Sequence, residues 1–219
     1  MAHAIIFDLD GTLADSSECV VQSAQEVARA ARLREVSDED IRQRIGEPLG
    51  PMLSALFGVS GDPLVDLTRA YSETYVRLTK TLERPFPDTI GMLQRLRERG
   101  WLLAIATGKS QNGAENATRR MALASLFDGI HGIIPGTPGK PDPAVLMRAM
   151  ADLGVSAEQS IMVGDTTFDL DMAAAAGVSS VAVSWGVHAT EVLEGCSPGA
   201  LVFDMTELEA ELNRRFTGV

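Results

Sequence analysis

The chain has 219 residues, of which 45% are apolar and 22% charged, and its formal net charge is −11. This length allows one full α/β domain and a smaller second domain, and the acidic balance argues against nucleic-acid binding, which needs clustered Lys and Arg. The two cysteines, Cys19 and Cys196, lack CxxC spacing, so neither a disulfide framework nor a structural zinc site is indicated. No apolar run approaches the length of a membrane span, and we expect a cytoplasmic protein without membrane contacts.

The first predicted element is a buried strand that starts at Ala4 and ends in two carboxylates, Asp8 and Asp10, followed by Gly11 in a tight turn. The one-residue gap points both carboxylates the same way at the carboxyl end of the strand, where open parallel sheets bind ligands. Two acids this close repel each other, and Mg²⁺ compensates them naturally because it takes oxygen ligands. A calcium loop is excluded because Cys19 occupies the position of its bidentate Glu, whereas simple turn capping stays open from this segment alone.

The following segment, residues 15–84, carries helical patterns and no strand pattern. Asp15 and Glu18 have the spacing of a capping box, which predicts a helix start with Asp15 as its N-cap. The apolar face of this helix is predicted from Val20, Val21, Ala24, Val27, Ala28 and Ala31. Further helices are expected over Ser37–Arg44, Pro51–Phe57 and Pro63–Leu82. We therefore predict a small all-helical domain at residues 15–84, inserted into a core made of residues 1–14 and 85–219.

From residue 85 onward, short apolar strands alternate with helices. The expected strands are Leu102–Ala106, Gly129–Ile134, Ser160–Val163, Ser180–Val183 and one more from Leu201. The expected helices are Thr89–Arg99, Ala114–Ala124, Pro143–Leu153, Asp169–Ala176 and a last one that ends at Arg215. Such alternation predicts an α/β fold, a doubly wound parallel sheet with right-handed crossovers.

Polar clusters follow three of these strands, and they contain Thr107-Gly108-Lys109, Gly139-Lys140-Pro141 and Gly164 to Asp169. The first cluster is no P-loop, because Leu103 stands where that loop requires a glycine. Since parallel strands end at one edge of the sheet, these clusters should meet the two acids of the first strand. A metal ion and a lysine would there neutralise phosphate oxygens while a carboxylate attacks phosphorus. The residues alone predict a phosphoryl-transfer site and do not select the attacking acid.

Four motifs in order resemble those of the haloacid dehalogenase superfamily of phosphotransferases. They are Asp8-Leu9-Asp10-Gly11-Thr12, Thr107-Gly108, Lys140-Pro141 and Gly164-Asp165-Thr166-Thr167-Phe168-Asp169. The resemblance covers nearly the whole chain, since the helical insertion is similar to the family's helical cap, and it implies a Rossmann-like core. Asp15-Ser16 and the segment Pro85-Phe86-Pro87-Asp88 resemble phosphoglycolate phosphatase-like members.

The resemblance implies a role for each matching residue. Asp8 would be the nucleophile that forms an aspartyl-phosphate, and Asp10 would protonate the leaving oxygen and later activate water. Thr107, Gly108 and Lys140 would bind the phosphoryl group. Lys140 would also partly neutralise the negative charge of Asp8.

The same resemblance implies Mg²⁺ as the cofactor. Its ligands would be Asp8, Asp165 and the backbone carbonyl of Asp10, while Asp169 would support the metal through water or Lys140. An acid at position 10 disfavours the family's dehalogenases, which lack it, and its transport ATPases, which carry threonine there.

Substrate choice is expected to lie with the cap that roofs the site. Arg44, at a break between cap helices, and Lys109 are the candidates for substrate recognition. His188 is interpreted as a structural or surface histidine, because the implied mechanism leaves no role for it.

The resulting hypothesis is a magnesium-dependent phosphatase of a small phosphorylated metabolite, with 2-phosphoglycolate as the best guess. The alternatives are a β-phosphoglucomutase-like sugar phosphomutase, a pyrophosphatase and, less favoured, a non-catalytic binding module. A phosphonoacetaldehyde hydrolase is disfavoured because Lys80 is badly placed for its Schiff base. We expect a monomer or homodimer whose partner is the small phosphorylated substrate.

Overall fold

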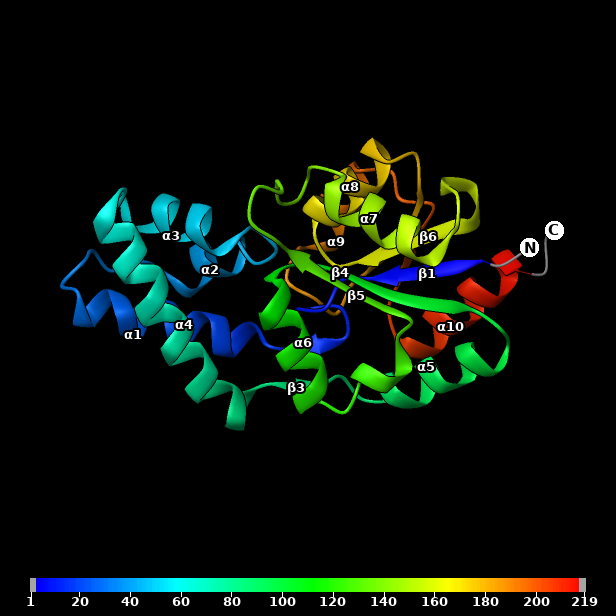
Figure 1. Cartoon of the computed structure of the whole chain (residues 1–219), viewed down its shortest axis with the longest axis horizontal. Coiled ribbons are helices and arrows are strands. Elements are labelled where there is room, and N and C mark those ends of the chain that lie inside the picture. The colour runs from blue at the N-terminus through cyan, green and yellow to red at the C-terminus, as the bar shows by residue number, and fades with distance from the viewer. Residues whose placement is uncertain (1–2, 217–219) are drawn as a thin grey trace.

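The computed structural model describes residues 3–216. Its elongated shape has a bundle of four helices at one end and a sheet flanked by helices at the other (Figure 1). Both described ends of the chain lie at the far side of the sheet, away from the four helices (Figure 1).

The sheet has six parallel strands in the order β5-β4-β1-β6-β7-β8. Their bounds are β1 Ala4–Phe7, β4 Leu102–Ser110, β5 Gly129–Ile133, β6 Ser160–Gly164, β7 Ser179–Val183 and β8 Ala200–Val202. The chain runs outward from β1 in both directions, so β1 lies at the point where the strand order reverses. This arrangement confirms the predicted doubly wound α/β fold, and it puts the end of β1 where such sheets bind ligands.

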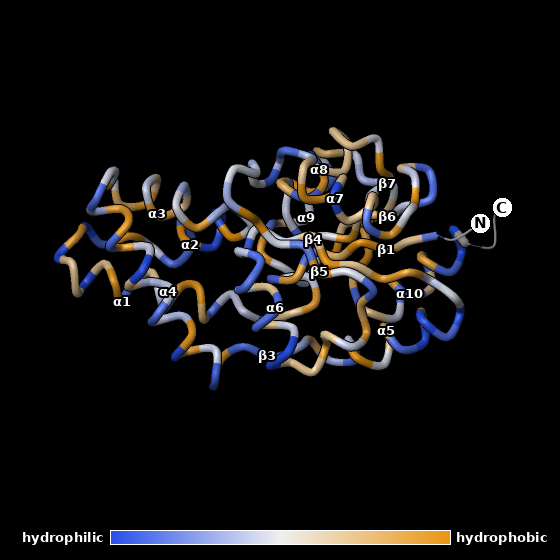
Figure 2. The backbone as a smooth tube through the Cα atoms, viewed as in Figure 1, coloured by the Kyte–Doolittle hydropathy of each residue, from blue (hydrophilic) through white to orange (hydrophobic). Residues whose placement is uncertain are grey.

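Helices cover both faces of the sheet because successive strand side chains point to opposite sides. Ile5 and Phe7 of β1 pack with one group of helices, and Ile6 between them packs with the other. The first group is α5 Thr89–Glu98, α6 Gln111–Arg120 and α10 Met205–Phe216; the second is α7 Ala144–Leu153, α8 Thr167–Ala175 and α9 Thr190–Gly195. In Figure 2 the strands at the centre of the sheet form a hydrophobic interior between these two layers.

The four-helix bundle has its own hydrophobic cluster. It comprises α1 Ser17–Ala30, α2 Asp38–Arg42, α3 Leu49–Phe57 and α4 Asp62–Leu82. The predicted apolar face of α1 is buried in this cluster up to Ala28, where it meets Leu53 of α3 and Leu67 of α4. Ala31 lies beyond the end of α1 and is exposed, so its assignment to that face was wrong.

The predicted helix start at Asp15 was also wrong. Asp15 belongs to a short strand, β2 Ala14–Asp15, which pairs antiparallel with β3 Arg84–Pro85. The helix therefore begins at Ser17, and Ser16 at its N-cap makes no capping hydrogen bond with its side chain. Asp15 pairs with a segment about 70 residues away instead of capping the helix. This pairing holds together the two chain segments that connect the bundle to the sheet.

Other boundaries also differ from the predictions by a few residues, most clearly at the end of β4 and the start of α6. β4 continues to Ser110, because its pairing with β5 resumes there after a register shift beyond Ala106. α6 starts at Gln111, since the Ser110 side chain accepts a hydrogen bond from the backbone of Gly113 and caps the helix. Short 3₁₀ turns occupy Ala124–Leu126 and Ala157–Gln159. Among the described residues no helix is both long and apolar enough to cross a bilayer.

Candidate active site

Asp8 follows the last residue of β1, and its position is fixed by the sheet. Its backbone N–H donates to the carbonyl of Val163 on β6 over 2.9 Å, and the residue is 2% exposed. By register, Phe7 pairs with Ile105 on one side and Val163 on the other. Thr107 and Asp165 therefore each lie two residues beyond a partner of Phe7, flanking the end of β1 as the strand-end argument predicts.

Lys140 comes from the loop between β5 and α7, and it is 4% exposed rather than solvated. Its ammonium donates hydrogen bonds to Oδ1 of Asp8 and, over 2.5 Å, to Oδ1 of Asp169. Burial alone would lower the pKa of Lys140, but the charges of Asp169 and Asp8 more than offset that effect and raise it. The lysine therefore stays charged between two carboxylates.

Asp169 has two functions in the structure. Its Oδ2 accepts hydrogen bonds from the backbone and hydroxyl of Thr166, at 3.1 and 2.7 Å, in a capping box that starts α8. Its other oxygen binds Lys140. The helix cap thus holds the carboxylate in a fixed orientation toward the lysine.

Asp165 follows β6, and hydrogen-bond donors closely surround its carboxylate. Its Oδ1 accepts a hydrogen bond from the Thr12 hydroxyl at 2.8 Å, and its Oδ2 accepts from the backbone N–H of Val187 at 2.9 Å. A Cβ atom at Gly11 or Gly186 would come within 2.2 or 2.1 Å of the carboxylate. Glycines at both positions are therefore required for the backbone to approach Asp165 this closely.

Asp8 and the two acids of the segment after β6 form one cluster. Carboxylate oxygens of Asp8, Asp165 and Asp169 lie within 4.8 Å of one another, and all three residues are buried. Burial raises the pKa of Asp8 to about 7, although Lys140 lowers it. The pKa of Asp165 lies well above its ordinary value because of burial and then of the charges on Asp169 and Asp8.

Three buried carboxylates beside a single lysine leave negative charge without compensation. Hard divalent cations prefer oxygen donors of this kind. The backbone at Gly11 and Gly186 packs closely against Asp165 and keeps its carboxylate fixed. The donor set therefore fits Mg²⁺.

The carboxylate of Asp10 is not part of this cluster among the described residues. Its Oδ1 accepts a hydrogen bond from Ser16 at 2.5 Å, and its Oδ2 lies 2.9 Å from the ammonium of Lys109. The predicted metal contact of Asp10 through its backbone carbonyl stays a prediction.

Thr107 and Gly108 lie on the irregular end of β4. Thr107 is buried, and its hydroxyl accepts a 3.3 Å hydrogen bond from the backbone of Lys109. A Cβ atom at Gly108 would lie 2.6 Å from the carbonyl oxygen of Gly46, which belongs to the bundle. The loop between α2 and α3 therefore contacts the edge of the sheet at Gly108.

The same bundle loop contacts a second site segment. A Cβ atom at Gly139, next to Lys140, would lie 2.0 Å from Cγ of Pro48. Arg44, two residues before Gly46, pairs with Glu47 over 2.9 Å and reaches none of the clustered acids of the described chain. The bundle loop thus contacts two segments that carry predicted site residues, and Arg44 is paired within its own loop.

His188 bridges the bundle and the site loops. Its Nδ1 accepts a hydrogen bond from the backbone of Thr167 at 3.1 Å, and its Nε2 lies 3.3 Å from the carbonyl oxygen of Gln43. These contacts are with backbone atoms, in agreement with the structural histidine that was predicted.

Three contacts of the site were not predicted from the sequence. They are the hydroxyl of Thr12, the backbone of Val187 and the side chain of Tyr75, which binds Lys109. The sequence does place the segment with Val187, which follows β7, at the border of the pocket, and only its hydrogen bond to Asp165 was not predicted. Tyr75 lies in the middle of α4, where no sequence pattern distinguishes it from a core residue.

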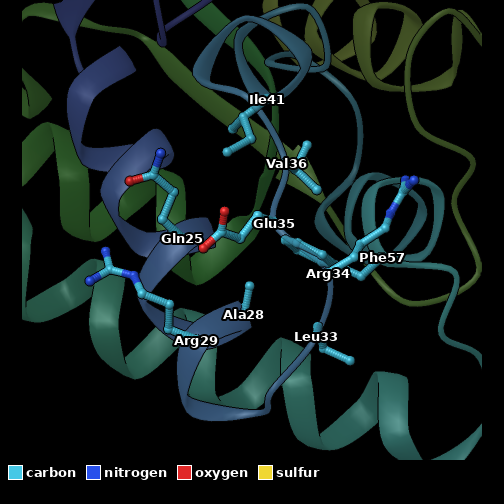
Figure 3. A pocket seen from close by; sticks show the side chains of 9 residues that line it. All are labelled: Gln25, Ala28, Arg29, Leu33, Arg34, Glu35, Val36, Ile41 and Phe57. Atoms are coloured by element: carbon cyan, nitrogen blue, oxygen red, sulfur yellow. The ribbon is translucent and has the colours of Figure 1, made fainter.

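A pocket of about 290 Å³ lies in the bundle (Figure 3). Its walls come from α1, the connection to α2, and α3, and include Arg29, Arg34 and Glu35. None of the predicted site residues lines it.

The sequence is similar to one known family over most of its length. The profile of the family described as haloacid dehalogenase-like hydrolase matches residues 5–183. A solved structure, the haloacid dehalogenase-like family protein SP0104 from Streptococcus pneumoniae, superimposes with a TM-score of 0.86 at 27% identity and covers 96% of this chain and 98% of its own.

Individual relatives differ in the activity that their names state. The protein named "Probable phosphatase IndB" of Dickeya dadantii is 32% identical, over 95% of this chain and 92% of its own. The phosphoglycolate phosphatase of Mesorhizobium japonicum is 30% identical, over 96% and 95%. The pyrophosphatase PpaX of Bacillus velezensis is 27% identical, over 94% of each chain.

Proposed function

Because this chain belongs to the haloacid dehalogenase-like hydrolase family, we propose that it is a magnesium-dependent phosphatase that hydrolyses a small phosphorylated metabolite through an aspartyl-phosphate. One observation carries the proposal. The buried ammonium of Lys140 binds both Asp8 and Asp169 beside Asp165, an arrangement suited to holding a phosphoryl group against a carboxylate nucleophile.

In the first step one carboxylate oxygen of Asp8 bonds to phosphorus as the bond from phosphorus to the leaving oxygen breaks. Asp10 gives its proton to that oxygen, so the leaving group departs as an alcohol or acid. Lys140 and the hydroxyl of Thr107 bind the phosphoryl oxygens, whose charge grows at this point.

In the second step Asp10, now ionised, takes a proton from a water molecule. The water oxygen bonds to phosphorus while the bond between phosphorus and the Asp8 oxygen breaks. Inorganic phosphate leaves, the Asp8 carboxylate is restored, and Asp10 again carries a proton.

The cation proposed for the cluster is Mg²⁺, held by Asp8, Asp165 and the backbone carbonyl of Asp10. When bound, it supplies positive charge against the phosphoryl oxygens. Asp169 acts through Lys140, whose ammonium it shares with Asp8.

Residues 15–84 are proposed to act as a cap that covers the site and excludes bulk water during the reaction. The contacts of the bundle loop with Gly108 and Gly139 support this role, because they bring Gly46 and Pro48 against two segments that carry site residues. A covered site favours small substrates over proteins.

The proposed substrate is 2-phosphoglycolate, supported by the relative of that activity. The second candidate is inorganic pyrophosphate, supported by the relative named PpaX. A sugar phosphomutase would use the same first step but transfer the phosphoryl group back to sugar rather than to water.

The test is phosphate release from a panel of 2-phosphoglycolate, pyrophosphate, sugar phosphates and nucleotides, with Mg²⁺ and with chelator. We expect Mg²⁺-dependent release concentrated on one or two compounds and absent with Asp8→Asn. A folded, Mg²⁺-binding protein that releases no phosphate from any compound would overturn the proposal, and isomerisation of a phosphosugar without release would favour the mutase.

A further inference from the structure

Lys109 is held at the site by contacts with both the sheet and the bundle. Its ammonium lies 2.9 Å from Oδ2 of Asp10 and donates a 2.7 Å hydrogen bond to the hydroxyl of Tyr75 on α4. The same nitrogen lies 4.4 Å from the centre of the Tyr75 ring, within cation–π range. An ammonium has three N–H donors, and the third has no acceptor among residues 3–216.

Tyr75 is itself held by a buried carboxylate that pairs with a partly exposed arginine. Its hydroxyl accepts from Lys109 and donates to Oε1 of Glu83 over 2.9 Å. The Glu83 side chain is fully buried and its other oxygen binds Arg120 of α6. The ammonium therefore has a defined position, set by a chain of contacts from α6 through the end of the bundle to α4.

Lys109 lies at the more solvent-exposed end of the site. The side chains of Asp8, Lys140 and Asp169 are at most 3% exposed, whereas those of Asp10 and Lys109 are each 13% exposed. A phosphoryl group bound at Asp8 must direct its leaving group toward Asp10, which protonates the leaving oxygen. The leaving group therefore occupies the space beside Lys109.

Charge balance then restricts the leaving group. Before substrate binds, Asp10 is the ionic partner of Lys109. A leaving group that enters beside Asp10 displaces water from the ammonium of Lys109, and a partly buried charge that loses its water without gaining a counter-charge is unfavourable. An anionic group on the leaving group supplies that counter-charge and accepts the spare N–H of Lys109.

We propose that Lys109 is a specificity-determining residue that binds a negatively charged leaving group, with Tyr75 and Glu83 as its positioning residues. The substrates are then small phosphoesters or anhydrides whose leaving group carries a charge close to the bridging oxygen. The carboxylate of glycolate and the second phosphate of pyrophosphate both meet this requirement, whereas simple alcohols do not. This inference rests on the proposed phosphatase function.

The alternative cation, Arg44, is less suited to this role. It is 38% exposed and engaged with Glu47 of its own loop, and no contact joins it to Asp10 within the described residues. Lys109 touches Asp10 directly, so it is the cation that the leaving group meets first.

The test compares two substrates of nearly equal shape, 2-phosphoglycolate and ethyl phosphate, which differ by the carboxylate. For Lys109→Met we expect the ratio of their kcat/KM values to fall about 10- to 100-fold, the scale of a lost charged hydrogen bond. Lys80→Met makes the same change of charge at an exposed position of α4 and should leave the ratio at the wild-type value.

Tyr75→Phe keeps the ring under the ammonium and removes the hydroxyl. We expect it to raise KM for 2-phosphoglycolate several-fold with little change in kcat, because binding of the charged group weakens while the chemistry at Asp8 is intact. A purely structural role of Tyr75 would move both substrates alike. Calorimetric binding of 2-phosphoglycolate to Asp8→Asn protein, with and without Lys109→Met, provides a readout without turnover.

Equal losses on both substrates with Lys109→Met, or unchanged binding in calorimetry, would overturn the proposal and leave the phosphatase function intact. A wild-type protein that prefers ethyl phosphate would do the same. Absence of phosphate release from every ester would instead mean that the proposed function itself had failed.

Discussion

Lys140 and Asp169 are joined by a buried ion pair of 2.5 Å between Nζ and Oδ1, and the same ammonium also binds Asp8. The helix cap of α8 holds Asp169, and β1 holds Asp8, so the lysine connects two rigid elements. Removing it would leave two carboxylates buried without their cation.

We therefore expect Lys140→Met to abolish turnover and to lower the free energy of unfolding of metal-free protein by about 3–5 kcal/mol, the usual cost of a buried charge pair that loses one partner. Denaturant unfolding in chelator measures this loss. Lys80→Met serves as the matched control, because it removes the same charge at the surface. Full stability of the Lys140 variant would contradict the assignment of a charged, paired lysine.

Asp165 should destabilise the metal-free protein at neutral pH. Burial, followed by the charges of Asp169 and Asp8, raises its pKa well above the unfolded value, so its contribution to stability is greatest near pH 4 and is lost as the pH rises. Asp165→Asn can keep the hydrogen bonds with Thr12 and Val187, because an amide both donates and accepts.

For metal-free protein at pH 7 we expect a higher melting temperature with Asp165→Asn than with wild type, and a difference that vanishes toward pH 4. Addition of Mg²⁺ should raise the melting temperature of wild type and leave that of the variant unchanged. Thermal unfolding at several pH values, with and without Mg²⁺, measures both effects. An equal Mg²⁺ response of the two proteins would exclude Asp165 as a ligand.

The contact of Pro48 with Gly139 is predicted to be needed for the cap to sit on the site. Gly139→Ala would bring a methyl group within 2.0 Å of Cγ of Pro48, and relief of such a clash costs about 1–3 kcal/mol. We expect kcat/KM to fall about 5- to 150-fold, the kinetic equivalent of that range. Gly50→Ala is the control, since nothing lies within 4 Å of its Cβ position and activity should be retained.

Much of this fold could be predicted because its signals are local. The alternation of apolar strands and helices defines a parallel sheet, and the shared edge of parallel strands predicts that Asp8, Thr107, Lys140 and Asp165 meet. The sheet and its helices confirm that architecture. Asp8, Thr107 and Asp165 lie at the ends of neighbouring strands, and Lys140 reaches Asp8 from the loop after β5. Their catalytic roles rest on the family resemblance and stay predictions.

Other features depend on partners far along the chain. A lysine in a loop of prolines and glycines is ordinarily exposed, so the place of Lys140 in the site is predicted by the combined strand-end clusters and not by its own segment; the acids that bind it are 132 and 29 residues away. Asp15 had a sound local capping signal, which lost to strand pairing with Arg84. Tyr75 has the sequence pattern of a core aromatic residue. The hydrogen bond of its hydroxyl with Lys109 depends on where α4 packs, so it could not be predicted from the sequence.

The central claim is that Asp8 carries the phosphoryl group in a covalent intermediate. The most direct measurement is a rapid acid quench of wild-type protein with ³²P-labelled substrate and Mg²⁺, followed by mapping of the label by peptide mass spectrometry. We predict label on the peptide that contains Asp8, formed in a burst that approaches the enzyme concentration and absent from Asp8→Asn protein. Rapid phosphate release with no protein-bound label, or undiminished release by the Asp8→Asn variant, would contradict the account.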